Sequence, residues 1–343
     1  MVEMWTAGVG LPGLAVRMAR RAEAQGWDGI GMVDSQSLAG DPYVELGLAA
    51  AATSRIGLAT AAAIATVQAE SGGRAVLGIG RGDSALAHLG LSPAPVSMFR
   101  TYLERLQGYL RGDDVPFDVA ADGAGEVRPS EALGMAGGPE TSSLHWLGAS
   151  TAKVPVDVAA TGPKVIAAGA VLAERVTFAV GADPARVRWA IDLAGAARQA
   201  AGLDPHGLGL GAYLPLIVHP DRPTARRLIA GGVASYARFS VMHGQVVGPA
   251  AEADQRTLTA VHDAYDMDRH FTHGSPQSAV LTDEVIDAFG VAGPPSYCLE
   301  RLLELSELGL TKFFVMGGGF GLGREEREAS EGLLVEEVLP GLR

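Results

Sequence analysis

The sequence contains a single cysteine, Cys298, among its 343 residues. One thiol excludes an internal disulfide and a thiolate-rich metal cluster, and it suits a reducing compartment. Long apolar runs are also lacking, because charge or proline interrupts each of them well short of the about 20 residues that a membrane-spanning helix needs. The first five residues, Met-Val-Glu-Met-Trp, lack the basic region and apolar core of a secretion signal. We therefore expect a cytoplasmic protein that does not enter a membrane.

The sequence has no excess of basic residues, since 27 Lys and Arg face 39 Asp and Glu for a net charge of −12. Nucleic-acid surfaces need clustered basic residues, so a nucleic-acid-binding or scaffold protein is disfavoured. The run Arg-Glu-Glu-Arg-Glu at residues 324–328 is interpreted as a solvated helix face. None of the eight histidines has a partner at the helical spacing of a zinc site, so no metal is expected. His270 with His273 is interpreted as a polar helix face.

What the sequence does contain is a regular alternation of short apolar strands with amphipathic or alanine-rich helices, which is typical of parallel βαβ units. Candidate strands cover residues 5–9, 29–34, 56–60, 75–80, 154–160, 175–180, 208–218 and 312–317. Eight parallel strands, each followed by a helix, favour an α/β TIM (β/α)8 barrel. A two-domain, doubly wound sheet is the alternative. No repeat, low-complexity tract or linker divides the chain, so we expect one domain over residues 1–343.

Two stretches are longer than ordinary connections in such a barrel and predict insertions. Residues of about 113–150 are rich in glycine and contain a short apolar run at 144–147, which predicts an irregular insertion with a hairpin. Residues of about 221–295 have a mostly helical pattern and could form a lid or an oligomer contact. Substrate choice is expected to depend on these two insertions.

A glycine-bearing loop follows the apolar run at residues 156–160, and it predicts an anion site. Thr161 offers a capping hydroxyl, and Pro163 suits the first turn of a helix. Gly162 allows a ligand to approach the backbone closely. The free N–H groups of the helix start, together with Lys164, would bind a phosphate or a carboxylate. The alternative is an ordinary capped helix with a surface lysine.

A second glycine-bearing loop follows the apolar run at residues 75–79. Asp83 is the leading candidate for proton transfer, because a carboxyl group in a closed pocket can be tuned toward a neutral pKa. Its alternative role is that of a helix N-cap. Arg81 could offset negative charge on a reduced cofactor, or it could point to solvent. Neither loop has the glycine spacing of a Rossmann fingerprint, so a nicotinamide-binding Rossmann domain is not expected.

In a TIM barrel the chemistry lies at the carboxyl ends of the strands, where polar and small residues of this chain recur. Their alternative role is that of turn residues chosen for their backbone conformation. The positions that follow apolar runs are Thr6, Asp34, Ser35, Thr60, Gly80, Arg81, Gly82, Asp83, Thr161, Gly162, Pro163 and Gly317-Gly318-Gly319.

Several of these motifs resemble the bacterial luciferase-like flavin and deazaflavin oxidoreductase family, over nearly the full length of the chain. The matching segments are residues 24–30, 33–35, 64–68, 73–83, 162–164 and 294–309. Within the family, Gly-x-Gly-Asp at residues 80–83 followed by Ala87-His88-Leu89-Gly90 is most similar to the F420-dependent branch typified by methylenetetrahydromethanopterin reductase.

The resemblance implies a barrel, often dimeric, that binds coenzyme F420, a 5-deazaflavin, against the ends of the third and fourth strands. It implies a cofactor phosphate at the turn of Gly162 and Pro163. The expected cofactor-binding residues are Asp34, Thr60, Gly80, Arg81, Gly82, Asp83, Ala160, Thr161, Gly162, Pro163 and Lys164, and the expected catalytic residues are Asp83 and Ser35. Some relatives that oxidise sugar phosphates have histidine at the position of Ser35, so an identical reaction is not expected.

The chain departs from the family pattern after the third strand. Relatives carry an extended loop there, rich in Thr, Asn, Pro and His, that supports the ring of the cofactor. Here residues 58–64 run directly from strand to helix, so roughly a dozen residues are absent by comparison. Either the cofactor site is altered, or this sequence lacks a segment.

The expected function is that of an F420-dependent oxidoreductase that transfers a hydride between the deazaflavin and a small organic substrate. Such chemistry needs no metal, because the cofactor carries the two electrons. An FMN-dependent luciferase-like monooxygenase, in which reduced flavin activates oxygen, is one alternative. A barrel that binds its cofactor without turnover is the other. The expected partners are a small-molecule substrate and a second copy of the chain, without nucleic acid or membrane.

Overall fold

Parallel strands form a closed ring at the centre of the structure, a computed structural model that describes residues 2–9, 14–33, 42–59, 64–116, 134, 140–145, 147 and 151–342. The ring consists, in order, of β1 (Glu3–Val9), β2 (Gly29–Val33), β3 (Gly57–Ala59), β4 (Ala75–Ile79), β7 (Val156–Ala160), β8 (Arg175–Phe178), β9 (Gly209–Val218) and β11 (Lys312–Met316). Each strand pairs in parallel with the next, and β11 pairs with β1. The predicted (β/α)8 barrel is therefore confirmed, and the open doubly wound sheet is wrong.

All eight predicted strands are present, with ends that differ by at most two residues from the prediction. A ninth strand, β10 (Val291–Gly293), was not predicted and pairs in parallel with the last three residues of β9. β9 is long enough, at 10 residues, to pair with β8 and β11 near its start and with β10 at its end. β10 has only three residues between glycine and proline, too few for a periodic pattern to show.

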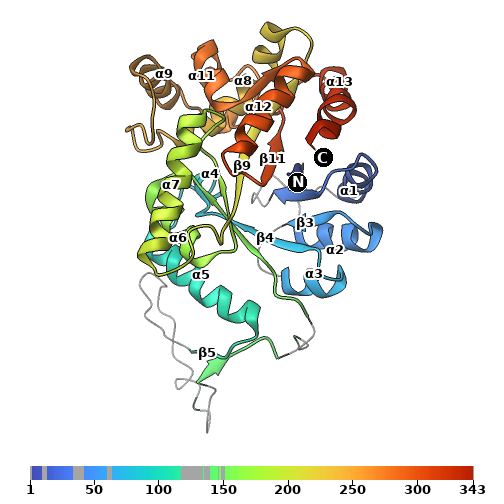
Figure 1. Cartoon of the computed structure of the whole chain (residues 1–343), viewed down its shortest axis with the longest axis vertical. Helices are drawn as coiled ribbons and strands as arrows, with labels where there is room; N and C mark the ends of the chain where they lie inside the picture. Colours follow the sequence, from blue (N-terminus) through green and yellow to red (C-terminus); the bar gives the residue numbers. More distant parts are fainter. Residues whose placement is uncertain are drawn as a thin grey trace.

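Helices surround the ring and follow its strands (Figure 1). They are α1 (Ala15–Ala24), α2 (Pro42–Ala52), α3 (Ile64–Glu70), α4 (Asp83–Ala87), α5 (Val96–Arg111), α6 (Pro163–Leu172), α7 (Pro184–Ala200), α8 (Arg222–Phe239), α9 (Glu252–Asp263), α10 (Pro276–Ala279), α11 (Asp283–Phe289), α12 (Pro295–Glu307) and α13 (Arg324–Leu333). Short 3₁₀ turns lie at Met267–Arg269 and Leu339–Leu342, and a π turn lies at Leu334–Val338. The outward side chains of the strands and the inner faces of these helices form the main buried core.

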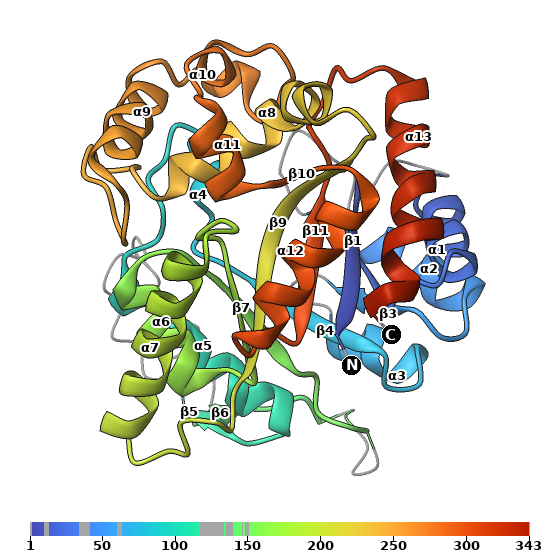
Figure 2. The same ribbon diagram turned by 45° about the horizontal axis from the view of Figure 1, so that its top comes forward.

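The two predicted insertions lie at opposite ends of the molecule. The first connects α5 to β7, so it lies at the amino end of the strands; its described part is an antiparallel hairpin of β5 (Val115–Pro116) and β6 (Thr141–Ser142). The predicted hairpin is confirmed, although the apolar run at 144–147 follows it rather than forming its strand. The second follows β9 and gathers α8, α9, α10 and α11 at the other end (Figures 1 and 2). Among the described residues, only this second insertion reaches the carboxyl ends of the strands.

Buried Arg186 of α7 attaches the second insertion to the barrel. Its Nε donates to the carbonyl of Val180, and its terminal nitrogens donate to the carbonyls of Pro249 and Val247 and to Oγ of Ser240. Burial lowers the pKa of this guanidinium to about 10. The segment that follows α8 is therefore held at a fixed distance from the barrel.

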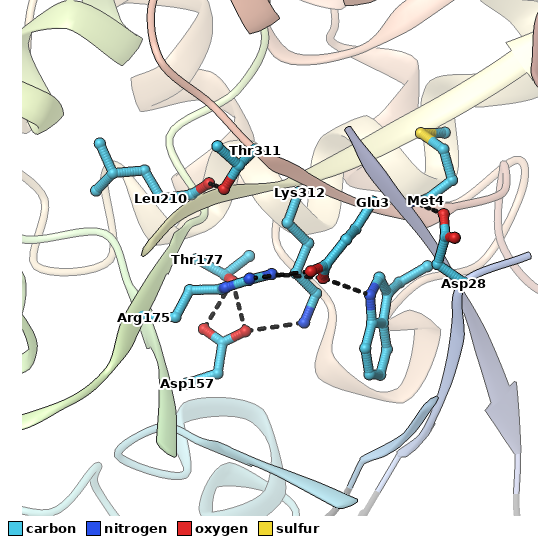
Figure 3. Close-up of polar contacts among 10 residues, drawn as sticks. Glu3, Met4, Asp28, Asp157, Arg175, Thr177, Leu210, Thr311 and Lys312 are labelled. Carbon is cyan, nitrogen blue, oxygen red and sulfur yellow. Dashed lines mark hydrogen bonds and ion pairs between the residues drawn. The ribbon is translucent and has the colours of Figure 1, made fainter. Parts of the chain in front are cut away.

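Charged and aromatic side chains fill the amino end of the barrel (Figure 3). Lys312 Nζ lies 2.9 Å from Asp157 Oδ2, with 3% and 4% of the two side chains exposed, and Thr177 Oγ1 donates to the same carboxylate at 2.7 Å. The ammonium also lies 3.9 Å from the centre of the Trp5 ring, a cation–π contact. A Cβ on Gly29 would lie 2.2 Å from that ring, so Gly29 is required there. Below this layer Arg175 pairs with Glu3 at 2.7 Å. We call this set the floor of the barrel.

Candidate active site

The opposite, carboxyl end of the barrel contains a cavity of about 450 Å³. Thr6 and Ala7 of β1, Met316 of β11 and the following Gly317 line it from the barrel. Tyr236 and other side chains of the second insertion line it as well, and so do side chains of α1 and α13. The cavity therefore lies where (β/α)8 barrels place their chemistry, and four of the predicted strand-end positions, Thr6 and Gly317-Gly318-Gly319, belong to it.

The inner wall of the barrel is bulky on one side and nearly bare on the other. Trp5 and Phe314 pack together in the interior, and Tyr213 lies 4.9 Å from Phe314 between ring centres. On β4, side chains alternate, so Gly78 and Gly80 face inward like Val76, which packs against the aromatic cluster. Among the described residues, no atom lies within 4 Å of where a Cβ on Gly78 would stand, and a Cβ on Gly80 would meet only Ala159 within 4 Å, at 3.6 Å or more. The wall formed by Gly78, Gly80 and Ala159 is therefore flat and open.

Asp83 stands directly beyond this open wall, at the first residue of α4. The N-cap is Gly82, whose φ of +82° favours glycine, and no side chain caps the helix. The alternative role of Asp83 as N-cap is therefore wrong. Its Oδ1 is buried and has no hydrogen-bond partner among the described residues. Burial raises the pKa of the Asp83 carboxyl, and the charges of Arg81, Arg238 and His243 oppose that rise.

Arg81 turns inward rather than to solvent. Its side chain is 15% exposed, its Nη1 donates to the carbonyl of Ala94 at 3.0 Å, and its Nη2 lies 3.7 Å from Asp83 Oδ1. The alternative of a solvent-facing Arg81 is therefore wrong. The guanidinium is fixed by the chain that precedes α5 and adds positive charge beside Asp83.

The glycine-bearing loop that follows β7 leads into α6, and this helix begins one residue later than predicted. Gly162, in extended conformation, is the N-cap, and Pro163 occupies the first turn. The predicted capping by Thr161 is wrong, because its hydroxyl donates to the carbonyl of Ala179 at 3.3 Å. Ala160 is buried, and Pro163 and Lys164 are exposed. The helix start is thus open to solvent and carries a lysine in its first turn.

The second insertion brings polar residues to this end that were not predicted to belong to the site. Arg238 lies in the last turn of α8, with its guanidinium 4.9 Å from the ring centre of Tyr265. His270 lines the cavity, and its Nδ1 lies 2.5 Å from Tyr265 Oη. Its ring lies 6.3 Å from that of His88, which follows α4. Only His88 carried a signal in the sequence, as part of a family-like motif.

The interpretation of His270 and His273 as a polar helix face is wrong. Both lie in turns after the 3₁₀ turn Met267–Arg269. Burial, together with the smaller effects of the neighbouring Arg238 and His88, lowers the pKa of His270 to about 4. His270 is therefore a neutral, cavity-facing imidazole at neutral pH.

Backbone contacts between glycines hold the loop of His270 in place. Gly232 of α8 donates its N–H to the carbonyl of Gly318 at 3.1 Å, and a Cβ on Gly318 would lie 1.9 Å from the carbonyl oxygen of Leu228. The loop is attached in turn by the N–H of Phe320, which donates to the carbonyl of Phe271 at 2.7 Å. The glycines after β11 therefore serve close packing, which agrees with their alternative role as backbone residues.

Three of the predicted site residues, Asp34, Ser35 and Thr60, lie outside the residues that the structure describes. Residues 324–328 are all exposed, with Arg324 paired to Glu328 at 2.9 Å, which confirms the predicted solvated helix face. In the described part of the chain, no group of three or more metal-type side chains could hold an ion. None of the described helices combines the length and apolar character needed to cross a bilayer.

Comparisons with known proteins place this geometry in context. A model of the family described as luciferase-like monooxygenase matches residues 10–312. The chain is 25% identical over 326 residues to 5,10-methylenetetrahydromethanopterin reductase of Methanolobus tindarius, a match that covers 90% of this chain and 91% of the relative. It is 28% identical over 293 residues to the protein of the same name from Archaeoglobus fulgidus, with coverages of 83% and 78%.

A solved structure shares the fold over the whole chain. The coenzyme F420-dependent tetrahydromethanopterin reductase from Methanopyrus kandleri superposes with a TM-score of 0.72 at 20% identity, covering 100% of this chain and 99% of that one.

Proposed function

Because the chain belongs to the luciferase-like monooxygenase family, we propose that it is an F420-dependent oxidoreductase acting on a small organic substrate. Both curated relatives are named 5,10-methylenetetrahydromethanopterin reductase, and the solved structure is described as coenzyme F420-dependent. The observation that carries the proposal in this molecule is the open wall of Gly78, Gly80 and Ala159 beside the Asp83 carboxyl, whose buried Oδ1 accepts no hydrogen bond from a described residue.

The open wall fits the flat ring of a deazaflavin. Side chains at Gly78 and Gly80 would occupy the space where the ring would lie, and among the described residues only Ala159 borders that space within 4 Å of the two positions. The aromatic side of the barrel, with Tyr213 and Phe314, limits the depth to which a ring can enter. Gly80 and Gly82 let the backbone pass close to the ring without steric conflict.

The start of α6 fits the cofactor's phosphate. A ten-residue helix presents the positive end of its dipole there, and Gly162 leaves the first N–H groups accessible. Lys164 adds a positive charge on the exposed side. Ala160 and Thr161 set the position of this turn at the end of β7, with the Thr161 hydroxyl bound to the neighbouring strand end.

F420, when bound, supplies the hydride-carrying carbon of the reaction. Asp83 holds or releases a proton at its buried Oδ1, since its raised pKa keeps the protonated form accessible nearer to neutral pH. Arg81, fixed through Ala94, keeps a positive charge beside that carboxyl and beside the ring. The roles of Asp34, Ser35 and Thr60 in cofactor binding and catalysis stay predictions from the sequence.

The test is a fluorescence titration of the purified full-length chain with F420 and, separately, with FMN. We expect saturable binding of F420 at micromolar or lower concentration and weaker binding of FMN, followed by oxidation of reduced F420 with 5,10-methylenetetrahydromethanopterin or another substrate of a screen. Binding of neither cofactor would overturn the proposal.

An FMN-dependent monooxygenase is the second candidate, because the matched family model is described by that activity and the same flat wall accepts a flavin ring. Preference for FMN, with oxygen uptake when the flavin is reduced, would establish this candidate. Binding of F420 without hydride exchange with any substrate of the screen would instead indicate a barrel that binds its cofactor without turnover.

We also propose that two copies of the chain associate in the cytoplasm. Gly47, Leu48 and Ala51 form an exposed apolar stripe on α2, and 51% of Leu48 is exposed. A helix whose outer face is apolar as well as its inner face is characteristic of a protein interface. A single cysteine, the buried Cys298, suits a reducing compartment.

A further inference from the structure

Polar atoms without partners gather between α4 and the end of α8. Asp83 Oδ1, Ser84 Oγ and His88 Nε2 on one side, and Arg238 Nη1 on the other, are each buried and have no hydrogen-bond partner among the described residues. The two sides belong to one cluster, because Asp83 interacts electrostatically with Arg238 and the His88 ring approaches that of His270. Buried polar groups in proteins are nearly always hydrogen-bonded, so four unpartnered atoms in one place indicate a bound group.

The cluster has an excess of positive charge. Asp83 is a carboxyl group with two guanidinium groups, Arg81 and Arg238, around it. Arg81 has a carbonyl partner, whereas the Arg238 guanidinium is held against the faces of Tyr265 and Phe239 at 4.9 and 5.9 Å. A buried charge without a hydrogen-bonded counterion is costly, and an anion beside Arg238 would remove that cost.

The neighbouring imidazole of His270 is held at the edge of the same space. The Tyr265 hydroxyl donates to Ser235 Oγ at 3.3 Å, so in the contact of 2.5 Å between Tyr265 and His270 the Nδ1–H of the imidazole donates to the tyrosine oxygen. The proton of the neutral imidazole is then on Nδ1. His270 lines the cavity, so its side chain reports on a ligand there without donating a hydrogen bond to it.

We propose that Arg238, with Ser84 and His88, binds an oxyanionic group of the substrate, a carboxylate or a phosphate. The statement that this ligand is a substrate rests on the proposed function. The donor set recognises an oxyanion from any source, and F420 itself carries phosphate and carboxylates on its tail, so the experiment separates the two sources.

The experiment measures oxyanion binding by NMR on the full-length chain labelled with ¹⁵N-histidine, with sodium malonate and sodium phosphate as probes and sodium chloride at equal ionic strength as the reference. We expect saturable shifts of the His88 and His270 side-chain signals. Arg238→Gln should weaken probe binding at least about tenfold, because a charge-assisted hydrogen bond is lost. Arg227→Gln, an exposed arginine on the same helix, is the matched control and should leave binding unchanged.

Two further variants keep the result independent of folding defects. Ser84→Ala removes only a hydroxyl and should weaken probe binding, and Arg238→Lys should retain part of it. Shifts no larger than those with chloride, or equal affinities in the wild-type protein and Arg238→Gln, would overturn the proposal.

The cofactor arm uses F420 and its tail-free deazaflavin chromophore. If the oxyanion belongs to the substrate, Arg238→Gln binds both as the wild-type protein does. If Arg238→Gln loses affinity for F420 but not for the chromophore, the subsite belongs to the cofactor tail and the assignment to substrate is wrong. Oxyanion binding that depends on Arg238 in a protein that binds no F420 would keep the subsite and overturn only the proposed cofactor.

Discussion

Asp157 and Asp83 are two carboxyl groups inside the same barrel with opposite surroundings. Asp157 in the floor accepts hydrogen bonds from Lys312 and Thr177. Asp83 at the carboxyl end keeps a buried oxygen without a partner, and burial raises its pKa. A fully paired carboxylate contributes to a rigid core, whereas an unpaired one is available to a ligand. The two positions therefore respond differently to substitution.

Asp83→Asn is expected to lower kcat by about 10²- to 10⁴-fold, because the amide preserves the shape but cannot hold and release a proton. F420 affinity should change by less than about threefold. In the wild-type protein, a step that needs protonated Asp83 should slow as the pH rises through its raised pKa. Steady-state kinetics against pH check both statements, with Asp113→Asn as a surface control; a full rate in Asp83→Asn would remove this residue from the mechanism.

The lowered pKa of His270 predicts that the protein loses stability in acid. Its pKa is about 4 in the native state against an ordinary 6.5, so the unfolded chain binds its proton more tightly. The contribution of neutral His270 is fully present above about pH 6.5 and is lost as the pH falls toward 4, by up to about 3 kcal/mol. Urea unfolding at several pH values should show this loss in the wild-type protein and a smaller one in His270→Gln. Parallel pH profiles for the two proteins would contradict the assignment.

Lys312→Met should destabilise the barrel by about 3–5 kcal/mol, because it leaves the Asp157 carboxylate buried without its counterion. The double variant Asp157→Leu with Lys312→Met should recover most of that loss, since no buried charge remains. Urea unfolding measures the free energies, and exposed Lys164→Met serves as the reference substitution. A double variant no more stable than the single one would show that the ion pair itself, rather than its disruption, determines stability.

At the scale of elements, strands were easier to predict than the contacts of the second insertion. A parallel strand is covered on both faces and appears as an apolar run between turn residues, so the eight strands of the ring were found from the sequence. Arg238 occupies the last turn of a helix, where basic residues are common for reasons of local stability, and nothing nearby in the sequence relates it to Asp83. Only the path of α8 over the barrel brings the two together.

The same limit explains the errors at the two loops. Thr161 had the chemistry of an N-cap, but its hydroxyl is satisfied by the neighbouring strand end, and Gly162 caps the helix with its backbone alone. His270 and His273 had a helical spacing, but tertiary contacts place them in turns. In each case a partner distant in the sequence decided the outcome.

Glycines of two elements should respond differently to alanine. Gly318→Ala is expected to destabilise the protein by about 1–3 kcal/mol, because the new Cβ would meet the carbonyl of Leu228 at 1.9 Å and the backbone must move. Gly78→Ala should keep or slightly raise stability, since no atom of the described part of the chain lies within 4 Å of the added carbon. It should weaken F420 binding at least about tenfold. Unfolding curves and fluorescence titrations test the pair, and normal F420 affinity in Gly78→Ala would exclude the open wall as the ring site.

At the scale of the whole molecule, the apolar stripe of Gly47, Leu48 and Ala51 predicts association. Sedimentation velocity should show a dimer for the wild-type chain and a shift to monomer for Leu48→Asp, because a buried unpaired charge is costly at an interface. Leu303→Asp on α12, where 41% of the leucine is exposed, is the matched control and should remain dimeric. A Leu48→Asp variant that remains dimeric would show that the interface lies elsewhere. A monomeric wild-type chain would show that the chain does not form the proposed dimer.

The floor of the barrel has a consequence for the order of events during turnover. Lys312, Asp157, Thr177 and Trp5 fill the barrel at its amino end in the described part of the chain, so the interior communicates with solvent at the carboxyl end. In the arrangement proposed above, a ring against Gly78 would lie deeper than a substrate above it beside His270. The deeper molecule must then arrive first and depart last, and product must leave before the cofactor exchanges. Kinetics of the compulsory-order type follow from how the barrel is closed, independently of which substrate it serves.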